Sequence, residues 1–312
     1  MFIADAHCDT LYEIAICHTA PGACAVTREK LAAGGVGLQT FALFAGKHGV
    51  KGTPRQDGLD MLAAVGRLGI PIYTGALPEE PPEAPSGILS CEGGEMFEGS
   101  IERFHEFMAL GRLRMVALTW NFENEIGHPA AEGPQGGLKP FGRALLKEMD
   151  AAGVLADVSH LNEAGFWDVV EHAALPPIAS HSNCRWLCDV PRNLTREQAR
   201  AIIDRGGFIG VNFYTRFLRT EGPAALDDVV RHIDAICEMG GEKAVGFGSD
   251  FDGIELWPRG LASPADFPAL LDALRRRGYS EPVLADIAGL NLWHTVCAAN
   301  SCRERATKPG RP

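Results

Sequence analysis

The chain has 312 residues, of which 46% are hydrophobic and 22% are charged, and its formal net charge is −11. This composition is typical of a globular protein with a large core, and the negative charge argues against nucleic acid or an anionic membrane as a partner. The N-terminus lacks a basic segment followed by an apolar one, and no apolar run reaches transmembrane length. Because the first β-run starts at residue 2, we expect no cleaved leader and a cytoplasmic location.

Nine cysteines are scattered along the chain without CxxC spacing. An odd number without paired spacing predicts reduced, mostly buried thiols, and it argues against a disulfide framework or a cysteine-rich zinc site.

Eight β-runs follow one another along the chain, with helical patterns and glycine-rich turns between them. The runs are continuously apolar, as expected for parallel strands buried on both faces. The predicted strands are 2–9, 37–44, 88–92, 115–120, 154–160, 177–181, 208–213 and 244–250.

The helical patterns carry recognisable end signals. Pro54 stands in the first turn of one, Gly153 follows the end of another, and Thr195 with Gln198 forms a capping box before a helix that ends at Gly206-Gly207. The residues after Cys302 are polar, which predicts a frayed C-terminal tail. The further predicted helices are 10–16, 54–68, 101–110, 141–152, 162–173, 226–239, 265–277 and 283–299.

Alternating strands and helices predict an α/β protein with a TIM (β/α)8 barrel, in one domain covering residues 1–312. The alternative is an open doubly wound sheet, which would need a GxGxxG turn after the first strand, and there is none. Two long loops interrupt the pattern. Residues 78–85 are rich in proline and glutamate and predict an exposed loop, whereas 121–140 has the length of a functional or disordered loop.

Ionisable residues stand at the carboxyl ends of five predicted strands, where the reactive groups of such barrels gather. His7 and Asp9 are two residues apart in the first strand, so they point the same way. The alternative is that His7 is only hydrogen-bonded in a polar turn. Buried ionisable groups need a partner, and a cation supplies one. Six ligand-type residues exceed the need of one zinc ion and suit two metals sharing a carboxylate; they are His7, Asp9, Glu92, His160, His181 and Asp250.

Six short segments together resemble the membrane (renal) dipeptidase family, peptidase family M19, in a bacterial-type cytoplasmic form. Each segment alone is a weak signal, but their combination and order are specific, and the resemblance extends from the first strand to at least Asn291. The segments are Asp5-Ala6-His7-Cys8-Asp9, Cys91-Glu92-Gly93-Gly94, Asp157-Val158-Ser159-His160, Ser180-His181-Ser182, Arg192-Asn193 and 248–253.

The resemblance implies a zinc-dependent dipeptidase with a TIM barrel and two Zn²⁺ ions bridged by Glu92. It implies that His7, Asp9 and Glu92 hold one ion. Glu92, His160 and His181 would hold the other, and Asp250 and Glu92 would be the catalytic carboxylates. The residues expected to bind substrate are Arg192, Asn121, Tyr214 and Asp250.

One position departs from the family pattern. Animal members have a histidine after Leu-Thr on the fourth strand, and it helps to polarise the scissile carbonyl, whereas here Trp120 follows Leu118-Thr119. That role then falls to a metal alone or to a group on the following loop, for which Asn121 and His128 are the candidates. We expect Trp120 to pack in the barrel mouth.

Three functions fit these residues. The first is hydrolysis of dipeptides, and the second is hydrolysis of a cyclic amide, lactone or other small amide by the same centre, since fold does not fix function. The third is a catalytically inactive metal-binding barrel. The expected partners are a small dipeptide and possibly a second copy of the chain. Side-chain preference and the choice among zinc, manganese, cobalt and iron stay open.

Overall fold

Eight parallel strands form a closed barrel in the order of the sequence, as the alternating pattern predicts. The computed structural model describes residues 1–46, 48–50, 52–133 and 136–307. Each strand pairs with the next, and β1 pairs with β8 to close the ring. The strands are β1 Ile3–Asp5, β2 Val36–Phe44, β3 Ser86–Glu92, β4 Met115–Ala117, β5 Leu155–Asp157, β6 Ile178–Ala179, β7 Phe208–Val211 and β8 Val245–Phe247.

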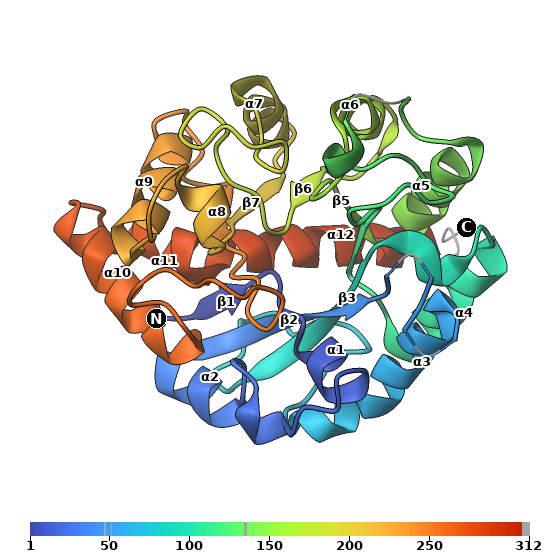
Figure 1. Cartoon of the computed structure of the whole chain (residues 1–312), viewed down its shortest axis with the longest axis horizontal. Helices are drawn as coiled ribbons and strands as arrows, with labels where there is room; N and C mark the ends of the chain where they lie inside the picture. Colours follow the sequence, from blue (N-terminus) through green and yellow to red (C-terminus); the bar gives the residue numbers. More distant parts are fainter. Residues whose placement is uncertain (47, 51, 134–135, 308–312) are drawn as a thin grey trace, which may run out of the picture.

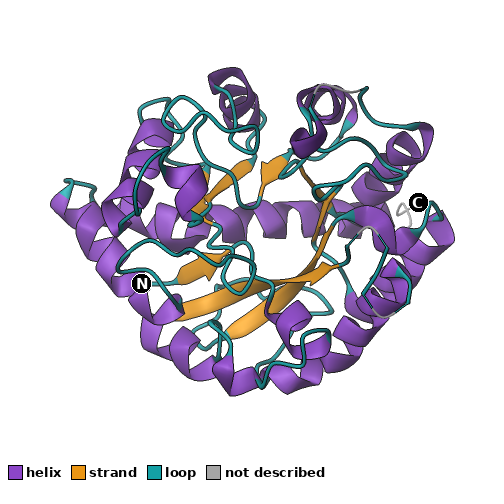
Figure 2. Cartoon of the chain, viewed as in Figure 1, coloured by secondary structure: helices purple, strands orange, loops and turns teal. Residues whose placement is uncertain are grey.

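The helices surround the strands on the outside of the ring (Figures 1 and 2). Short 3-10 turns lie at Pro21–Ala23, Val65–Leu68, Gly94–Phe97, Ala130–Glu132 and Pro264–Asp266, and a π-helical turn lies at Asp286–Leu290. The α-helices are α1 Thr10–Ala15, α2 Arg28–Gly34, α3 Pro54–Ala64, α4 Ile101–Gly111, α5 Pro140–Ala152, α6 Glu163–His172, α7 Arg196–Asp204, α8 Thr215–Leu218, α9 Leu226–Cys237, α10 Phe267–Arg276, α11 Glu281–Ala285 and α12 Asn291–Thr307.

The predicted end signals are confirmed. The Thr195 side chain accepts from the backbone of Gln198, and the Gln198 side chain accepts from the backbone of Thr195, so the capping box is complete. Gly153 ends α5 in the left-handed conformation with φ of 68°. The prediction missed α2, which Thr27 caps by accepting from Lys30, and it missed the short α8.

Two apolar layers make up the core. One lies between the strands and the outer helices. The other fills the barrel interior, where residues such as Leu38, Ile88 and Phe208 meet Trp293 of α12. Helix α12 runs behind the ring of strands in Figure 1 and closes that end of the barrel. The interior is therefore packed at one end, and a cavity is left at the opposite end, where the strands finish.

Most strands are shorter than the sequence predicts, and a pair of buried carboxylates explains where two of them stop. Asp157 is the last residue of β5, and its Oδ1 accepts from the backbone of Ser159 and Ser180, each at 2.9 Å. Asp5 ends β1 and accepts from the backbone of Ser249 at 2.8 Å. Because these side chains replace the neighbouring strand as acceptors, the ladder ends there. The predicted ligands other than Glu92 consequently lie in the loops just after the strands.

The end of the chain also differs from the prediction. The helix expected at 283–299 is divided into α11, the π-helical turn and α12, and α12 continues past Cys302 to Thr307. The remainder of the expected frayed tail, residues 308–312, lies outside the described residues.

Eight cysteines are free thiols in the described part of the chain, as predicted, and most are buried. No helix in the described ranges is both long and apolar enough to cross a membrane. The cytoplasmic location stays a prediction.

Candidate active site

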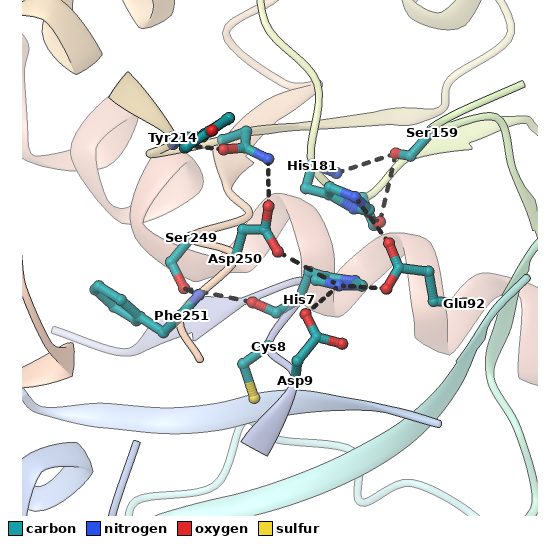
Figure 3. Close-up of polar contacts among 12 residues, drawn as sticks. His7, Cys8, Asp9, Glu92, Ser159, His181, Tyr214, Ser249, Asp250 and Phe251 are labelled. Atoms are coloured by element: carbon teal, nitrogen blue, oxygen red, sulfur yellow. Dashed lines mark hydrogen bonds and ion pairs between the residues drawn. The ribbon is translucent and has the colours of Figure 1, made fainter. Parts of the chain in front are cut away.

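The predicted ligands converge where the strands finish, although they come from four different strand–helix connections and from β3. Figure 3 shows His7, Asp9, Glu92, His181 and Asp250 facing one another. The Nε2 atom of His7 lies 3.4 Å from Asp9 Oδ2, 3.5 Å from Glu92 Oε2 and 3.8 Å from Asp250 Oδ1. His7 and Asp9 thus share a direction, as their two-residue spacing predicts. Cys8 between them is fully buried, as expected for a packed thiol.

The two oxygens of Glu92 face different histidines. Oε2 faces His7 at 3.5 Å, whereas Oε1 lies 2.9 Å from His160 Nε2 and 3.3 Å from His181 Nε2. Glu92 is the last residue of β3 and is buried. Its carboxylate therefore stands between two groups of ligand atoms, one on each side.

Hydrogen bonds fix which ring nitrogen of His181 carries a proton. The Ser180 hydroxyl has one proton, which it donates to Asp157 Oδ2. Its oxygen must then accept from His181 Nδ1, 2.7 Å away. His181 is consequently protonated at Nδ1 and presents a lone pair at Nε2.

His160 is oriented in the same manner by Asn121. The Oδ1 atom of Asn121 lies 2.9 Å from His160 Nδ1 and accepts its proton. Burial lowers the pKa of His160 to about 4, and it holds the pKa of His181 well below its ordinary value. Both rings are therefore neutral near pH 7, with Nε2 lone pairs.

A cation fits this arrangement. The Nε2 atoms of His160 and His181 lie 3.0 Å apart and both face Glu92 Oε1, so three acceptors meet without a proton between them. Nearby, His7 Nε2 and Asp9 Oδ1 are buried without a hydrogen-bond partner. Buried polar atoms in this state are costly, and a divalent metal would satisfy all of them.

The pKa values in the cluster also indicate that its carboxylates need positive charge nearby. Burial and the charge of Glu92 raise the pKa of Asp9 to about 8. Burial alone would raise the pKa of Glu92, yet the charge of His7 holds it well below its ordinary value. Burial alone would lower the pKa of His7, but Glu92 and Asp9 raise it well above its ordinary value. A bound divalent ion favours ionised acids and neutral imidazoles, so it would reverse the shifts of Asp9 and His7.

Asp250 is held at the edge of the cluster by a strained backbone and an amide. Its φ of 64° lies in the left-handed region, as does the φ of 68° at His160. Such strain in residues other than glycine is frequent at functional sites. Asn212 donates to Asp250 Oδ2 at 2.8 Å, which leaves Oδ1 facing the cavity and His7. Burial raises the pKa of Asp250.

Several residues that support the site were not singled out from the sequence. Asp5 accepts from the Ser249 hydroxyl at 2.5 Å, and Asp157 holds the segments that precede His160 and His181. Both acids belong to short motifs recognised in the sequence, where only the neighbouring histidines were given a role. Asn212 carried no sequence signal, since it lies beyond a strand without a neighbouring ligand type.

A cavity of about 380 Å³ opens onto the cluster. Its wall contains Asp9, Glu92, His160 and Asp250, together with the predicted substrate-binding residues Arg192, Asn121 and Tyr214. His128, the other candidate for the missing family histidine, is absent from this wall and instead lies 3.8 Å from Glu123.

Trp120 packs at the mouth of the barrel, as predicted, and one side of it lines the cavity. Its ring lies 4.9 Å from the ring of Phe44 and 5.5 Å from that of Phe122. An indole cannot carry a proton as an imidazole does, because its N–H only donates hydrogen bonds.

The fold and the buried histidine–carboxylate cluster define a metal-dependent hydrolase of the TIM-barrel class. The family model for membrane dipeptidase, peptidase family M19, matches residues 79–310. The chain therefore belongs to the membrane dipeptidase family and is a metallo-dipeptidase by class.

Three relatives illustrate the range of similarity. An uncharacterized protein in the pqqA 5′ region of Klebsiella pneumoniae is 42% identical over 63% of this chain and 76% of its own. An uncharacterized dipeptidase of Schizosaccharomyces pombe is 33% identical over 68% of this chain, and the match spans only 53% of the yeast protein. A metallopeptidase from Rhodobacter sphaeroides, solved with a phosphinate mimic of the dipeptide L-Ala-D-Ala, is 25% identical with a TM-score of 0.85, over 95% of this chain and 98% of its own.

Proposed function

We propose that this protein hydrolyses the peptide bond of dipeptides with two zinc ions bridged by Glu92. His7, Asp9 and Glu92 would hold one ion, and Glu92, His160 and His181 would hold the other. The observation that carries the proposal is the division of the Glu92 oxygens, since Oε2 faces His7 and Oε1 faces the two histidines with Nε2 lone pairs. A carboxylate with this placement can serve both ions.

Bound zinc supplies an acidified water and a positive charge for the carbonyl oxygen. The remaining work falls to this chain's own residues. Asp250 Oδ1 is placed to accept the proton that water loses as its oxygen attacks the carbonyl carbon. It then donates that proton to the amine nitrogen as the C–N bond breaks. Asn212 keeps Asp250 in place by its hydrogen bond to Oδ2.

Arg192 supports a substrate that ends one residue beyond the scissile bond. It is half-buried on the cavity wall, its guanidinium lies 5.4 Å from the ring centre of Phe217, and its Nε is buried without a partner. Its contacts with Ser182 and the carbonyl of His181 are long, at 3.5 and 3.4 Å. No ion pair joins it to Asp189 or any other described residue, so its charge is available for a substrate carboxylate.

The test compares a hydrolysed dipeptide with its C-terminal amide, after metal analysis of the purified protein. We expect about two zinc ions per chain and turnover within a panel of L,L and L,D dipeptides; the relative that binds an L-Ala-D-Ala mimic makes the L,D members a first choice. The amide should lose roughly tenfold or more in kcat/KM, and Arg192→Ala should weaken the free acid by a similar factor while hardly affecting the amide.

Other outcomes would point elsewhere. Equal penalties on acid and amide would show that Arg192 acts on the fold. Turnover of lactams or lactones without turnover of dipeptides would favour the second candidate function, and a metal-loaded protein without activity on any amide or ester would favour an inactive barrel.

A further inference from the structure

We infer that the subsite for the N-terminal residue of the substrate selects a cationic side chain, lysine or arginine, through Glu13. This inference rests on the proposed dipeptidase function. It begins with helix α1, which starts directly after the ligand Asp9 and forms part of the cavity wall.

One face of α1 carries the relevant groups. The backbone N–H of Glu13 bonds to the carbonyl of Asp9 at 3.2 Å, so the two residues are one helical turn apart on the same face. Asp9, Tyr12 and Glu13 all line the cavity. Four residues of α-helix rise about 6 Å along the helix axis. Glu13 therefore lies about 6 Å further along the cavity wall than Asp9, the proposed metal ligand.

That spacing decides which cationic group of a dipeptide can reach Glu13. The α-nitrogen of a substrate is about 2.5 Å from the carbonyl carbon under attack, so the α-ammonium stays near the metal ligands. The ammonium of lysine stands at the end of a flexible four-carbon chain and can extend a further helical turn. A side chain therefore fits Glu13 better than the α-ammonium does.

The position of α1 matches the N-terminal half of the substrate. Arg192 follows β6, whereas α1 follows β1 and lies across the ring of strands from the segment that joins β6 to α7 (Figure 1). With the substrate carboxylate at Arg192 and the scissile bond at the ligands, the N-terminal residue extends toward α1.

Aromatic rings line the path to Glu13. The ring of Tyr12 lies 5.0 Å from that of Phe44, and Phe44 lies 4.9 Å from Trp120, in edge-to-face contacts. All three side chains are half-buried on the cavity wall. Ring faces attract ammonium and guanidinium groups and also pack against their aliphatic stems.

Among the described residues of the cavity wall, none supplies a cation to Glu13. Arg192 is the one lysine or arginine among the described residues of the wall, and Asp252 is occupied by the hydroxyl of Thr10 and the backbone of Ala25 and Val26. Glu255 accepts from Tyr214. The Glu13 carboxylate accepts from the Thr19 hydroxyl at 2.5 Å, and it forms no ion pair with a residue that the structure describes.

The experiment compares two substrates of equal length, L-lysyl and L-norleucyl dipeptides that share the C-terminal residue the enzyme accepts best. Wild-type protein should favour lysine by roughly three- to tenfold in kcat/KM, the usual worth of a partly exposed ion pair with ring contacts. Glu13→Gln keeps an acceptor for Thr19 and should abolish the preference, and Glu13→Lys should reverse it. Inhibition constants of the matching phosphinate mimics should change in parallel.

A matched control removes one negative charge elsewhere. Glu80 is exposed in the loop before β3, at the opposite end of the strands, and Glu80→Gln should keep the wild-type preference. An equal loss on both substrates in Glu13→Gln would overturn the inference, because it would indicate contact with the α-ammonium or a fold effect. An unchanged preference would overturn it as well. Absence of all dipeptide turnover in wild type would instead remove the proposed function, and the inference with it.

Discussion

The proposed role of Asp250 as a general base depends on one carboxylate oxygen, Oδ1. Its Oδ2 accepts from Asn212 at 2.8 Å, while Oδ1 lies 3.8 Å from His7 Nε2. We expect Asp250→Asn to keep its metal and lose turnover by roughly 10²- to 10⁴-fold, the usual contribution of a general base. Metal analysis beside steady-state kinetics checks this. A variant that loses one ion per chain would make Asp250 a ligand, and wild-type turnover would remove it from the mechanism.

Asn121 can act on the proposed metal ligand His160 or on the substrate, and two substitutions separate these roles. Its Oδ1 accepts from His160, whereas its amide N–H groups remain for a carbonyl oxygen. If positioning of His160 dominates, Asn121→Leu should weaken binding of one ion by about 10- to 100-fold, and Asn121→Asp, which keeps the acceptor, should bind metal nearly normally. Competition with a chelator measures the affinities. Normal metal affinity with reduced kcat in both variants would assign Asn121 to the carbonyl.

At the scale of elements, His232 on α9 holds two loops that shape the cavity. Its Nδ1 accepts from the backbone of Cys184 at 3.0 Å, and its Nε2 donates to the carbonyl of Leu218 at 3.0 Å. The first bond anchors the segment that leads to Arg192, and the second anchors α8, which follows Tyr214. Protonation of Nδ1 would remove the acceptor for Cys184, so both loops depend on a neutral ring.

This dependence predicts a stability change with pH. Burial lowers the pKa of His232 to about 4. The charge of Arg231 also lowers this pKa, whereas the bond to the Leu218 carbonyl and the charge of Asp228 raise it. The unfolded chain, with an ordinary pKa near 6.5, takes up this proton first. Stability should therefore fall as the pH drops from about 6.5 to about 4, by roughly 3 kcal/mol. In urea unfolding, the His232→Asn variant should have a lower free energy of unfolding than the wild type at pH 7.5. Its free energy of unfolding should also change less with pH. His105→Asn, at an exposed site, should keep the wild-type slope.

The barrel and the cluster of candidate ligands could be predicted from the sequence because both leave local signals. Apolar runs of strand length, capping residues such as Thr195 and ligand types beside them are all visible in single segments. The strand ends could not be predicted, since Asp157 stops β5 by accepting from Ser180, which is 23 residues away in sequence. The tautomers of His160 and His181 and the placement of Glu13 depend likewise on contacts between separate elements.

At the scale of the whole molecule, a cluster of buried histidines and carboxylates lies at the end of the barrel where the eight strands finish. Helix α12 closes the opposite end of the barrel with apolar residues such as Trp293, and its Asn300 accepts from the buried guanidinium of Arg114 at 2.8 Å. The proposed ligands come from four connections and one strand, between β1 and the loop after β8. A cation bound there would join elements from the beginning, the middle and the last third of the sequence.

Metal removal should therefore destabilise the entire fold. A ligand that binds only the folded state at about 1,000 times its Kd contributes roughly 4 kcal/mol, which for a chain of this size corresponds to a rise in Tm of about 6 °C. Without metal, burial and the charge of Glu92 raise the pKa of Asp9 to about 8, so keeping both carboxylates ionised in this site is costly. We expect chelator-treated protein to unfold at a lower temperature and zinc to restore the wild-type value. Glu92→Gln, which removes the shared charge, should give a smaller zinc-dependent shift than Glu80→Gln. An unchanged Tm on chelation, with metal loss verified by elemental analysis, would show that the barrel holds this cluster together without the ions.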